Sequence, residues 1–418
     1  MGASLHLNVF NSVNPGFRLL AITLGGIYAL KLFALLTRRR PATPVGLAAF
    51  LFAWPGIVPA WFLERRGAQP IDASQFLGAW ARAFGGAGCI VLLAVFAPHI
   101  PDTILGLAGV AALLLTIHLG ICGLLPWLLR WAGFPVPLLF DRPWAARTLA
   151  EFWSRRWNSA FIELNQRLLL RPLRRRLSPG ATRLALFALS GLLHELALSF
   201  PAGAGWGLPL AYFLLHGVLV RIEQRLRIVS RAWTWLCLIA PAPWLFHEPF
   251  RRALILPFYR WLHAILAGHD AAWYLSCALY AAAAGHVLVL AASLQVPTRL
   301  GWKHDIPKLA RFNQKIFWVY GFYILLSIVS FAVLTWRLHD EFLAGEPAAR
   351  WLAGFIAVFW TVRVLVDLFW YDHRDWPPCN SLIAGHALVT TLFCALAAVY
   401  WFAALAPVAS SMAISPAI

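Results

Sequence analysis

Apolar stretches of about 20 residues recur along this 418-residue chain and constrain its fold more than any other feature. A helix of that length crosses a hydrocarbon core of about 30 Å. Charged residues make up 12% of the chain, against roughly 25% in soluble proteins, which excludes a cytosolic enzyme and a disordered protein. The stretches lie at residues 17–36, 45–63, 76–97, 103–129, 184–200, 207–220, 232–247, 253–267, 272–294, 314–336, 350–370 and 381–405.

One of these stretches, 45–63, is not expected to cross the membrane. Arg38–Arg40 and Arg65–Arg66 flank it, and Pro55 and Pro59 interrupt it. Basic residues collect in short cytoplasmic loops, so basic residues at both ends place both ends on the same side. We therefore predict a re-entrant segment, which is allowed where protein covers the backbone.

The loop from Arg130 to Arg183 is the strongest marker of topology. It carries 11 arginines against three acidic residues, and we place it on the cytoplasmic side. With 253–267 as an interfacial helix, the remaining stretches give about ten crossings with both termini outside. The predicted fold class is all-α: a polytopic integral membrane protein with about 10 transmembrane helices plus re-entrant and interfacial helices.

The charge of the chain indicates which partners it meets. Its formal net charge is +18, and all but four of its 35 basic residues are arginines, which bind phosphate bidentately. In a chain of membrane helices we expect lipid headgroups and a phosphorylated substrate as anionic partners, and no nucleic acid. The six cysteines are far apart and form no C-x-x-C pair, so we expect neither disulfides nor a metal site.

A change of pattern near Gly268 predicts two regions. Before it the apolar segments are broken, short and amphipathic, and after it come four long spans joined by polar loops. We expect a catalytic region at 1–268 and an appended four-helix transmembrane region at 269–418, whose role the sequence does not indicate.

The most informative polar stretch is Glu151-Phe152-Trp153-Ser154-Arg155-Arg156-Trp157-Asn158. At helical spacing Trp153, Trp157 and Phe161 share one face. This pattern predicts an amphipathic helix at the interface, with Trp at headgroup depth and Arg toward phosphates. Such a helix could be an anchor and nothing more, but Asn158 places an uncharged polar group on the face that should enter protein or lipid.

A second stretch, Ser190-Gly191-Leu192-Leu193-His194-Glu195, lies at the centre of an apolar segment. Ionisable groups within a span are costly and indicate function by default. His194 and Glu195 lie about 100° apart on a helix and do not pair naturally. Ser190 and Gly191 precede His194 by about one turn and leave room for a substrate. The alternative is a histidine that is buried and hydrogen-bonded between helices.

These two stretches, in this order and about 30 residues apart, resemble the wax-synthase branch of the membrane-bound O-acyltransferases. The segment Leu215-His216-Gly217, with Arg221-Ile222-Glu223 after it, is similar to that branch too. The resemblance implies transfer of an acyl group from acyl-CoA to a lipid hydroxyl, with His194 as the catalytic residue and Asn158 as its partner. We expect substrate contacts from Trp153, Arg155, Arg156, Trp157, Ser190, Glu195 and His216.

The residue types suit this chemistry. Imidazole can take the proton of an alcohol as the hydroxyl attacks a thioester, so His194 is the expected general base. Asn158 either donates to the developing oxyanion or orients the substrate. Acyl-CoA is the co-substrate, no cofactor is expected, and the Arg-rich loop offers sites for the CoA phosphates. A long-chain alcohol that yields a wax ester is the expected acceptor.

Other assignments stay open. The chain could be a transporter, or a haem- or metal-binding membrane protein that uses His286 and His386. It could also share the acyltransferase fold and acetylate an exported glycan. His118 is interpreted as a buried, hydrogen-bonded histidine. The expected location is a bacterial cytoplasmic membrane, because the chain is rich in Arg and shows no organelle-targeting signal. The oligomeric state is not predicted.

Overall fold

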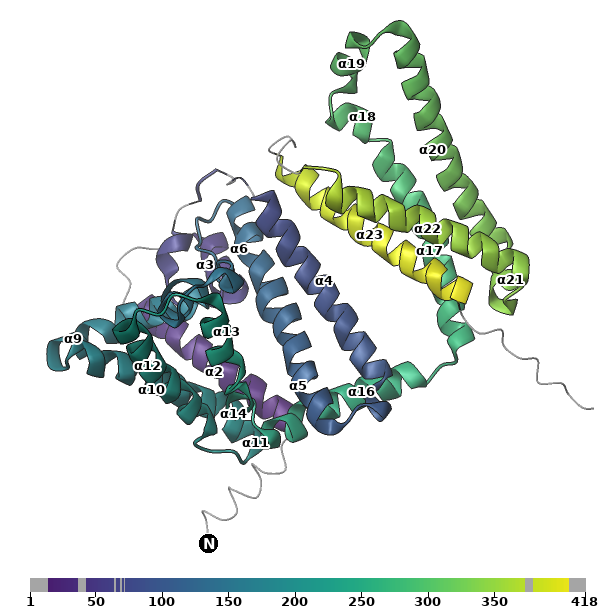
Figure 1. The fold of residues 1–418 in the computed structure, drawn as a ribbon. Helices are drawn as coiled ribbons and strands as arrows, with labels where there is room; N and C mark the ends of the chain where they lie inside the picture. Colours follow the sequence, from purple (N-terminus) through teal and green to yellow (C-terminus); the bar gives the residue numbers. More distant parts are fainter. Residues whose placement is uncertain are drawn as a thin grey trace, which may run out of the picture. The chain divides into compact units, whose positions relative to one another are not determined.

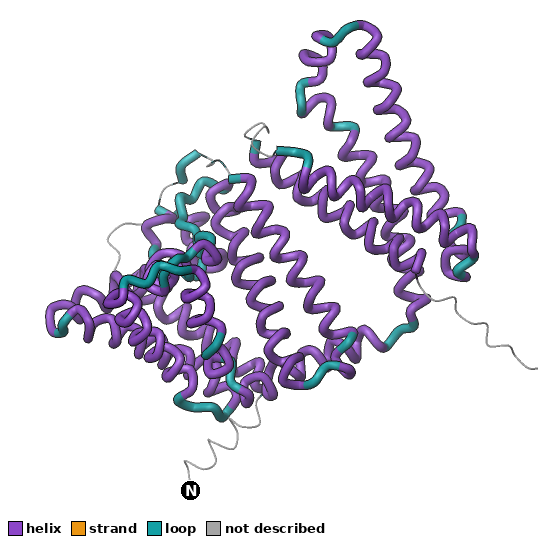
Figure 2. The backbone as a smooth tube through the Cα atoms, viewed as in Figure 1, coloured by secondary structure: helices purple, strands orange, loops and turns teal. Residues whose placement is uncertain are grey.

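The computed structural model describes residues 14–36, 43–63, 65–67, 70, 72–372 and 379–405. Every regular element in these ranges is helical (Figure 1, Figure 2). The chain divides into two compact units, Met1–Leu266 and Ala267–Ile418. Arg38–Arg40 and both ends of the chain, on which the predicted topology depends, lie outside the described residues.

The first unit combines long helices with short, broken ones. Its elements are α2 (Pro15–Leu36), α3 (Pro44–Ala53), η1 (Pro59–Phe62), α4 (Ala73–Val95), η2 (Ala97–His99), α5 (Asp102–Leu113), η3 (Leu114–Ile121), α6 (Cys122–Trp131), η4 (Pro143–Ala145), α7 (Leu149–Glu151), η5 (Phe152–Arg156), α8 (Ser159–Leu164), η6 (Asn165–Leu170), α9 (Arg171–Arg176), α10 (Pro179–His194), η7 (Glu195–Ser199), α11 (Phe200–Ala202), α12 (Leu208–Leu226), α13 (Arg231–Ile239), α14 (Ala242–Leu245), α15 (Glu248–Phe250), η8 (Arg251–Ile255) and α16 (Leu256–Ala267).

The second unit consists mainly of long helices, of which α22 and α23 run side by side (Figure 1). Its elements are α17 (Ala271–Ser293), α18 (Val296–Arg299), α19 (Trp302–Asp305), η9 (Ile306–Lys308), α20 (Arg311–Arg337), α21 (His339–Ala344), α22 (Pro347–Phe369) and α23 (Asn380–Leu405).

The prediction of an all-helical, polytopic membrane protein is confirmed. Within the described residues, eight helices are long and apolar enough to cross a membrane: Pro15–Leu36, Ala73–Val95, Asp102–Trp131, Pro179–Ala202, Ala271–Arg299, Arg311–Arg337, Pro347–Phe369 and Asn380–Leu405.

Two other stretches that we expected to cross the membrane, 207–220 and 232–247, are not among these eight helices. α12 places Arg221, Glu223 and Arg225 in its last two turns. The stretch 232–247 breaks at Pro241 into α13 and α14. The count of about ten crossings therefore stays a prediction.

The stretch expected to be re-entrant is a broken helix. Its first half forms α3, which ends at Trp54, where the backbone becomes extended. Pro55 follows directly, and a residue before proline is disfavoured in the helical region. A short helical turn, η1, begins at Pro59. The two prolines thus break the segment where the sequence predicts, and its place in the membrane remains a prediction.

Two glycines bring α10 and α12 close together. A Cβ atom added to Gly191 would lie 2.8 Å from the Cα of Leu210, and one added to Gly217 would lie 3.1 Å from Leu184. Small residues let membrane helices approach closely. The space beside Gly191 is therefore filled by α12, and the expectation that this glycine leaves room for a substrate is wrong.

Gly191→Ala is expected to destabilise the protein by about 1 to 3 kcal/mol, because the added methyl group must push α12 away. Gly180, on the same helix, is the matched control, since a Cβ there meets nothing within 4 Å. Gly180→Ala should leave the protein as stable as wild type or stabilise it by up to about 1 kcal/mol through helix propensity. Thermal unfolding midpoints in detergent measure both effects. Equal midpoints for the two variants would contradict the close packing.

Candidate active site

His194 lies at the end of α10, where the π-helical turn η7 begins. Its Nδ1 is 2.7 Å from the backbone oxygen of Ser190. A carbonyl oxygen only accepts hydrogen bonds, so Nδ1 carries the proton and Nε2 holds the lone pair. The side chain is half-buried, its ring centroid lies 4.4 Å from that of Phe213, and no described residue bonds to Nε2. His194 therefore presents an available base within a membrane span.

Ser190 contributes through its backbone, and its own side chain is buried. Glu195, the next predicted contact, bonds to backbone groups of another segment. Its Oε1 accepts from the backbone N–H groups of Gly207 at 2.9 Å and Leu210 at 3.1 Å. A carboxylate at a helix N-terminus satisfies unpaired N–H groups and meets the positive end of the helix dipole. Glu195 thus fixes the start of α12, the helix that carries Phe213 and His216.

The predicted single amphipathic helix through Trp153, Trp157 and Phe161 is wrong. The π-helical turn η5 ends at Trp157, whose backbone is extended, and Asn158 adopts a left-handed conformation with φ 51°. Asparagine tolerates this conformation better than most residues. The chain therefore changes direction at Asn158, and Phe161 belongs to a separate helix, α8.

Asn158 is the N-cap of α8. Its Oδ1 accepts from the backbone N–H of Phe161 at 3.2 Å, as capping asparagines do. The cap fixes which end of the amide is oxygen. The Nδ2 hydrogens have no acceptor among the residues the structure describes, so Asn158 keeps two donors for another molecule.

Aromatic rings connect the two motifs. Trp153 lies 5.6 Å from Phe213 and 5.5 Å from His216 between ring centroids, and Trp157 stacks on Phe152 at 5.3 Å. Trp153 and Trp157 are partly buried in this cluster. The Trp side chains therefore pack the segment around Asn158 against the helices that carry His194 and Phe213.

His216 is fully buried on α12. Its Nδ1 donates to the backbone oxygen of Tyr212 at 2.8 Å, and its Nε2 has no hydrogen-bond partner in the described part of the chain. From the sequence, His216 could contact substrate or form a structural hydrogen bond. In the structure one ring nitrogen has a hydrogen-bond partner and the other has none among the described residues.

The two motif arginines differ in their surroundings. Arg156 bonds to Glu151 at 2.6 Å and to the backbone oxygen of Asp141 at 3.0 Å, so it ties the motif to the preceding turn. Arg155 is exposed. Of the two, Arg155 is better placed to meet a phosphate from outside.

The Glu151 carboxylate has a lowered pKa. The main cause is a hydrogen bond from the backbone N–H of Arg147, followed by the hydrogen bond and charge of Arg156. A lowered folded-state pKa means that ionised Glu151 stabilises the fold above its unfolded pKa of about 4.3. That contribution is lost as the pH falls through the folded-state pKa.

We expect wild type to be more stable than Glu151→Gln at neutral pH by about 1 kcal/mol or less, because the pair is partly exposed. The difference should vanish as the pH falls below the folded-state pKa of Glu151. Unfolding midpoints recorded across this pH range measure it. Glu248→Gln, which breaks a more exposed pair with Arg252, is the matched control and should differ little from wild type. A gap between wild type and Glu151→Gln that persists in acid would contradict this assignment.

Glu223 has a structural role that the sequence did not assign. Its buried carboxylate accepts from the backbone N–H groups of Leu149 at 2.6 Å and Ala150 at 3.1 Å. It therefore caps the helical turn that leads into the Trp-Arg-Arg-Trp-Asn motif. The available signal was a carboxylate near an apolar segment, which needs a partner when buried.

His118 differs from its interpretation as a buried and satisfied histidine. Its side chain is exposed although it lies in the middle of the helix Asp102–Trp131. Its ring centroid lies 6.3 Å from that of Trp157 in a parallel arrangement. An ionisable residue within a span was the signal that could have identified it.

The two histidines considered as haem or metal ligands, His286 and His386, have protein partners. His286 is fully buried, donates from Nδ1 to Ala282 at 2.8 Å and accepts at Nε2 from the Trp360 indole at 3.1 Å. His386 pairs through Nε2 with Asp367 at 2.9 Å. Ligation of an iron requires a nitrogen lone pair, and in His286 the lone pair is used by Trp360.

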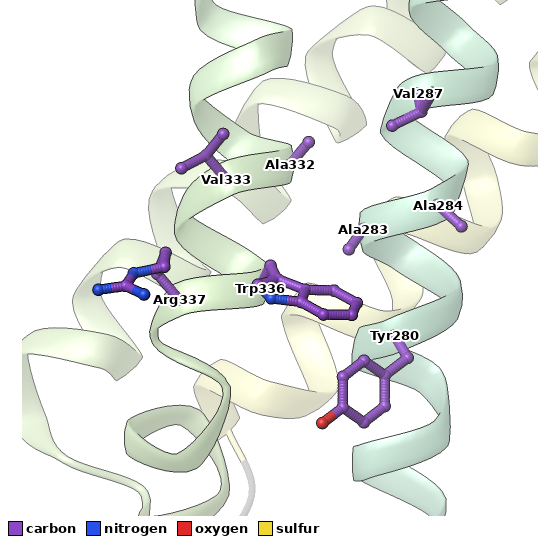
Figure 3. Close-up of a pocket in the computed structure, with 8 residues that line it drawn as sticks. All are labelled: Tyr280, Ala283, Ala284, Val287, Ala332, Val333, Trp336 and Arg337. Atoms are coloured by element: carbon purple, nitrogen blue, oxygen red, sulfur yellow. The ribbon is translucent and has the colours of Figure 1, made fainter.

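A groove of about 390 Å³ in the second unit lies between α17 and α20. Figure 3 shows that Tyr280, Trp336 and Arg337 lie at one end of a lining otherwise made of Ala and Val side chains. The residues that line this groove include no histidine or carboxylate.

Comparisons with known proteins match the same region. Residues 136–215, which contain Asn158 and His194, match the model of the membrane bound O-acyl transferase family. A probable long-chain-alcohol O-fatty-acyltransferase 2 of Arabidopsis thaliana is 31% identical over 140 residues, which cover 29% of this chain and 40% of the relative. A long-chain-alcohol O-fatty-acyltransferase of Simmondsia chinensis is 32% identical over 95 residues, which cover 20% and 27%.

The chain thus spans less than half the length of either relative. No solved structure matches it significantly. The family match covers the segment with both motifs, and both relatives are long-chain-alcohol acyltransferases by name. The predicted resemblance is confirmed: in the segment 136–215, which carries both motifs, the chain is similar to the wax-synthase-like membrane-bound O-acyltransferases.

Proposed function

We propose that this protein transfers a fatty acyl group from acyl-CoA to a lipid hydroxyl, most favourably a long-chain alcohol, to give a wax ester. The observation that carries the proposal is the state of His194: Nδ1–H is bound to Ser190, and Nε2 has no partner among the residues that the structure describes. An imidazole with its tautomer fixed and its lone pair accessible is suited to general base catalysis.

In the proposed reaction the alcohol oxygen attacks the thioester carbonyl carbon while its proton moves to His194 Nε2. The tetrahedral intermediate collapses, the carbon–sulfur bond breaks, and the CoA thiolate takes the proton from the imidazolium. Ester and CoA leave, and the histidine returns to its starting state. A site within the membrane keeps water, the competing nucleophile, away from the thioester.

Asn158 supports the same reaction as a donor. Its oxygen is held by the cap of α8, which leaves the Nδ2 hydrogens to bind a developing oxyanion or to orient the acceptor. Glu195 and Glu223 act indirectly in this proposal, because they fix the ends of the helical segments around the site.

The surroundings of the site suit the proposed substrates. An apolar groove of about 440 Å³ is lined by α12, α13 and α14 and includes Leu215 and Leu219 of α12, the helix that carries His216. A groove of this composition suits a hydrocarbon chain. Exposed arginines, including Arg155 and Arg174–Arg176, offer charge for the CoA phosphates.

We further propose that the first unit carries the reaction, because both motifs lie in it, and that residues 269–418 form an appended region. The helices make the protein an integral membrane protein. Its placement in a bacterial cytoplasmic membrane is part of the proposal, and fractionation of the native host would test it.

The function is tested with a panel of donors and acceptors. Membranes containing the protein receive labelled acyl-CoA of several chain lengths with fatty alcohols, sterols or diacylglycerol, and membranes lacking it serve as the control. Wax-ester formation supports the proposal. Acetyl transfer to a glycan from acetyl-CoA, with no lipid ester, would replace it by the glycan alternative, and a Soret band in the purified protein that His286→Ala removes would replace it by a haem protein.

A further inference from the structure

His118 has an accessible side chain within a membrane helix of the first unit. It lies in the π-helical segment η3, in the middle of a span. Trp157 stacks parallel to its ring at 6.3 Å, and Phe140 meets it edge-on at 6.1 Å. The side chain is nevertheless exposed. The ring therefore has protein on two sides and a remaining surface that another molecule can reach.

His118 and His194 belong to one cluster of aromatic rings. Trp157, which stacks on His118, directly precedes Asn158. From Trp157 the ring contacts continue through Phe152, Trp153 and Phe213 to His194. Three π-helical segments meet these groups: η3 carries His118, η5 leads into Trp157, and η7 begins directly after His194. π-Helical segments are rare in proteins, and those that occur are often found at functional sites.

Neither ring nitrogen of His118 has a hydrogen-bond partner among the described residues. A neutral imidazole offers one N–H donor and one acceptor, and an unsatisfied polar group at membrane depth is costly. The Trp157 and Phe140 rings hold the imidazole in place without using these groups. The donor of His118 therefore stays available to a molecule bound beside His194.

We propose that His118 is a further catalytic residue of the acyl transfer, and this inference rests on the function proposed above. Its N–H donates to the carbonyl oxygen of the thioester. As the alcohol oxygen bonds to the carbonyl carbon and its proton moves to His194 Nε2, the carbonyl oxygen gains negative charge. The His118 donor stabilises that charge until the carbon–sulfur bond breaks and the thiolate recovers the proton.

The test compares His118→Leu and His118→Gln with wild type in acyl transfer from acyl-CoA to a fatty alcohol. Removing one oxyanion donor typically lowers kcat about 100- to 1000-fold, and we expect that loss for His118→Leu with little change in KM. His118→Gln keeps an N–H donor and should recover much of the activity. Ile117→Ala, on the same π-helical segment and exposed, is the control and should remain close to wild type.

A second measurement follows the carbonyl directly. A ketone analogue of acyl-CoA, with a methylene group in place of the sulfur and a carbon-13 label, cannot transfer its acyl group. Its carbonyl stretch should shift to lower wavenumber when wild type binds it and should return toward the unbound value with His118→Leu.

Three results would overturn the inference: a wild-type kcat for His118→Leu, a loss confined to KM, or a carbonyl stretch that His118→Leu leaves unchanged. If wild type transfers acyl groups and His118→Leu does too, the inference fails and the proposed function stands. If wild type transfers no acyl group to any acceptor and does not shift the carbonyl stretch, both fail together.

Discussion

Replacing His194 with glutamine is expected to lower kcat for acyl transfer by about 100- to 10,000-fold, which is the usual contribution of a general base. Glutamine can keep a hydrogen bond to the Ser190 carbonyl that His194 makes through Nδ1, so the end of α10 should stay intact. It has no basic nitrogen to take the proton of the alcohol. The loss should therefore fall on kcat, with thermal stability in detergent close to that of wild type.

Two other histidines provide controls for this experiment. His263 also bonds through Nδ1 to a backbone oxygen, that of Ala94 at 3.0 Å, and His263→Gln should keep its activity. His286→Gln tests the rival assignment, in which the histidines of the second unit matter more than His194. Full activity of His194→Gln, or a larger loss from His286→Gln, would show that His194 is not the base.

The spans were predictable because hydropathy is a local property of the sequence. A run of about 20 apolar residues becomes a membrane helix whatever it packs against, and the long helices α4, α20 and α23 lie within or around the expected stretches. The break after α3 was predictable for the same reason, since proline acts on its own backbone and on the residue before it.

The motif around Asn158 was only partly predictable. The sequence identified Asn158 as the unusual polar residue, but the assumed helix continued through it. One backbone conformation, φ 51° at Asn158, separates Trp153 from Phe161. Helical spacing cannot show such a turn, because it assumes that the helix is unbroken.

The contacts between distant segments could not be predicted from spacing at all. Glu223 caps a turn 74 residues before it in the chain, and His118 meets Trp157 across the fold. The sequence showed polar residues in apolar surroundings, which implies that each has a partner or a function. Whether such a residue has a protein partner or a function depends on how the helices pack, and only the structure shows this packing.

Replacing Lys31 with methionine is expected to give the largest loss of stability among the variants considered. Lys31 lies in the membrane helix α2 with 2% of its surface exposed. Its ammonium group donates to the backbone oxygens of Phe50 at 2.6 Å, Leu51 at 2.8 Å and Trp54 at 2.5 Å. These three hydrogen bonds use every hydrogen of the ammonium group.

The three acceptors explain why the charged side chain of Lys31 lies buried in a membrane helix. The last carbonyl groups of a helix have no partner within it and form the negative end of its dipole. α3 ends within the apolar part of the sequence, where water is not available to satisfy them. Lys31 supplies the missing donors, and its charge is also close to the ring of Phe50, with 5.1 Å to the centroid.

Methionine keeps most of the length of the side chain and removes all three donors, so the carbonyl groups become unsatisfied. Each buried acceptor left without a donor costs about 1 to 3 kcal/mol, so losing three donors is expected to cost several kcal/mol. We expect a loss of that size in the unfolding free energy, with faster hydrogen exchange in residues 45–63. Lys303→Met, at an exposed lysine, is the matched control and should change neither quantity. If Lys31→Met were as stable as wild type and exchanged no faster, the end of α3 would have to be satisfied by another donor.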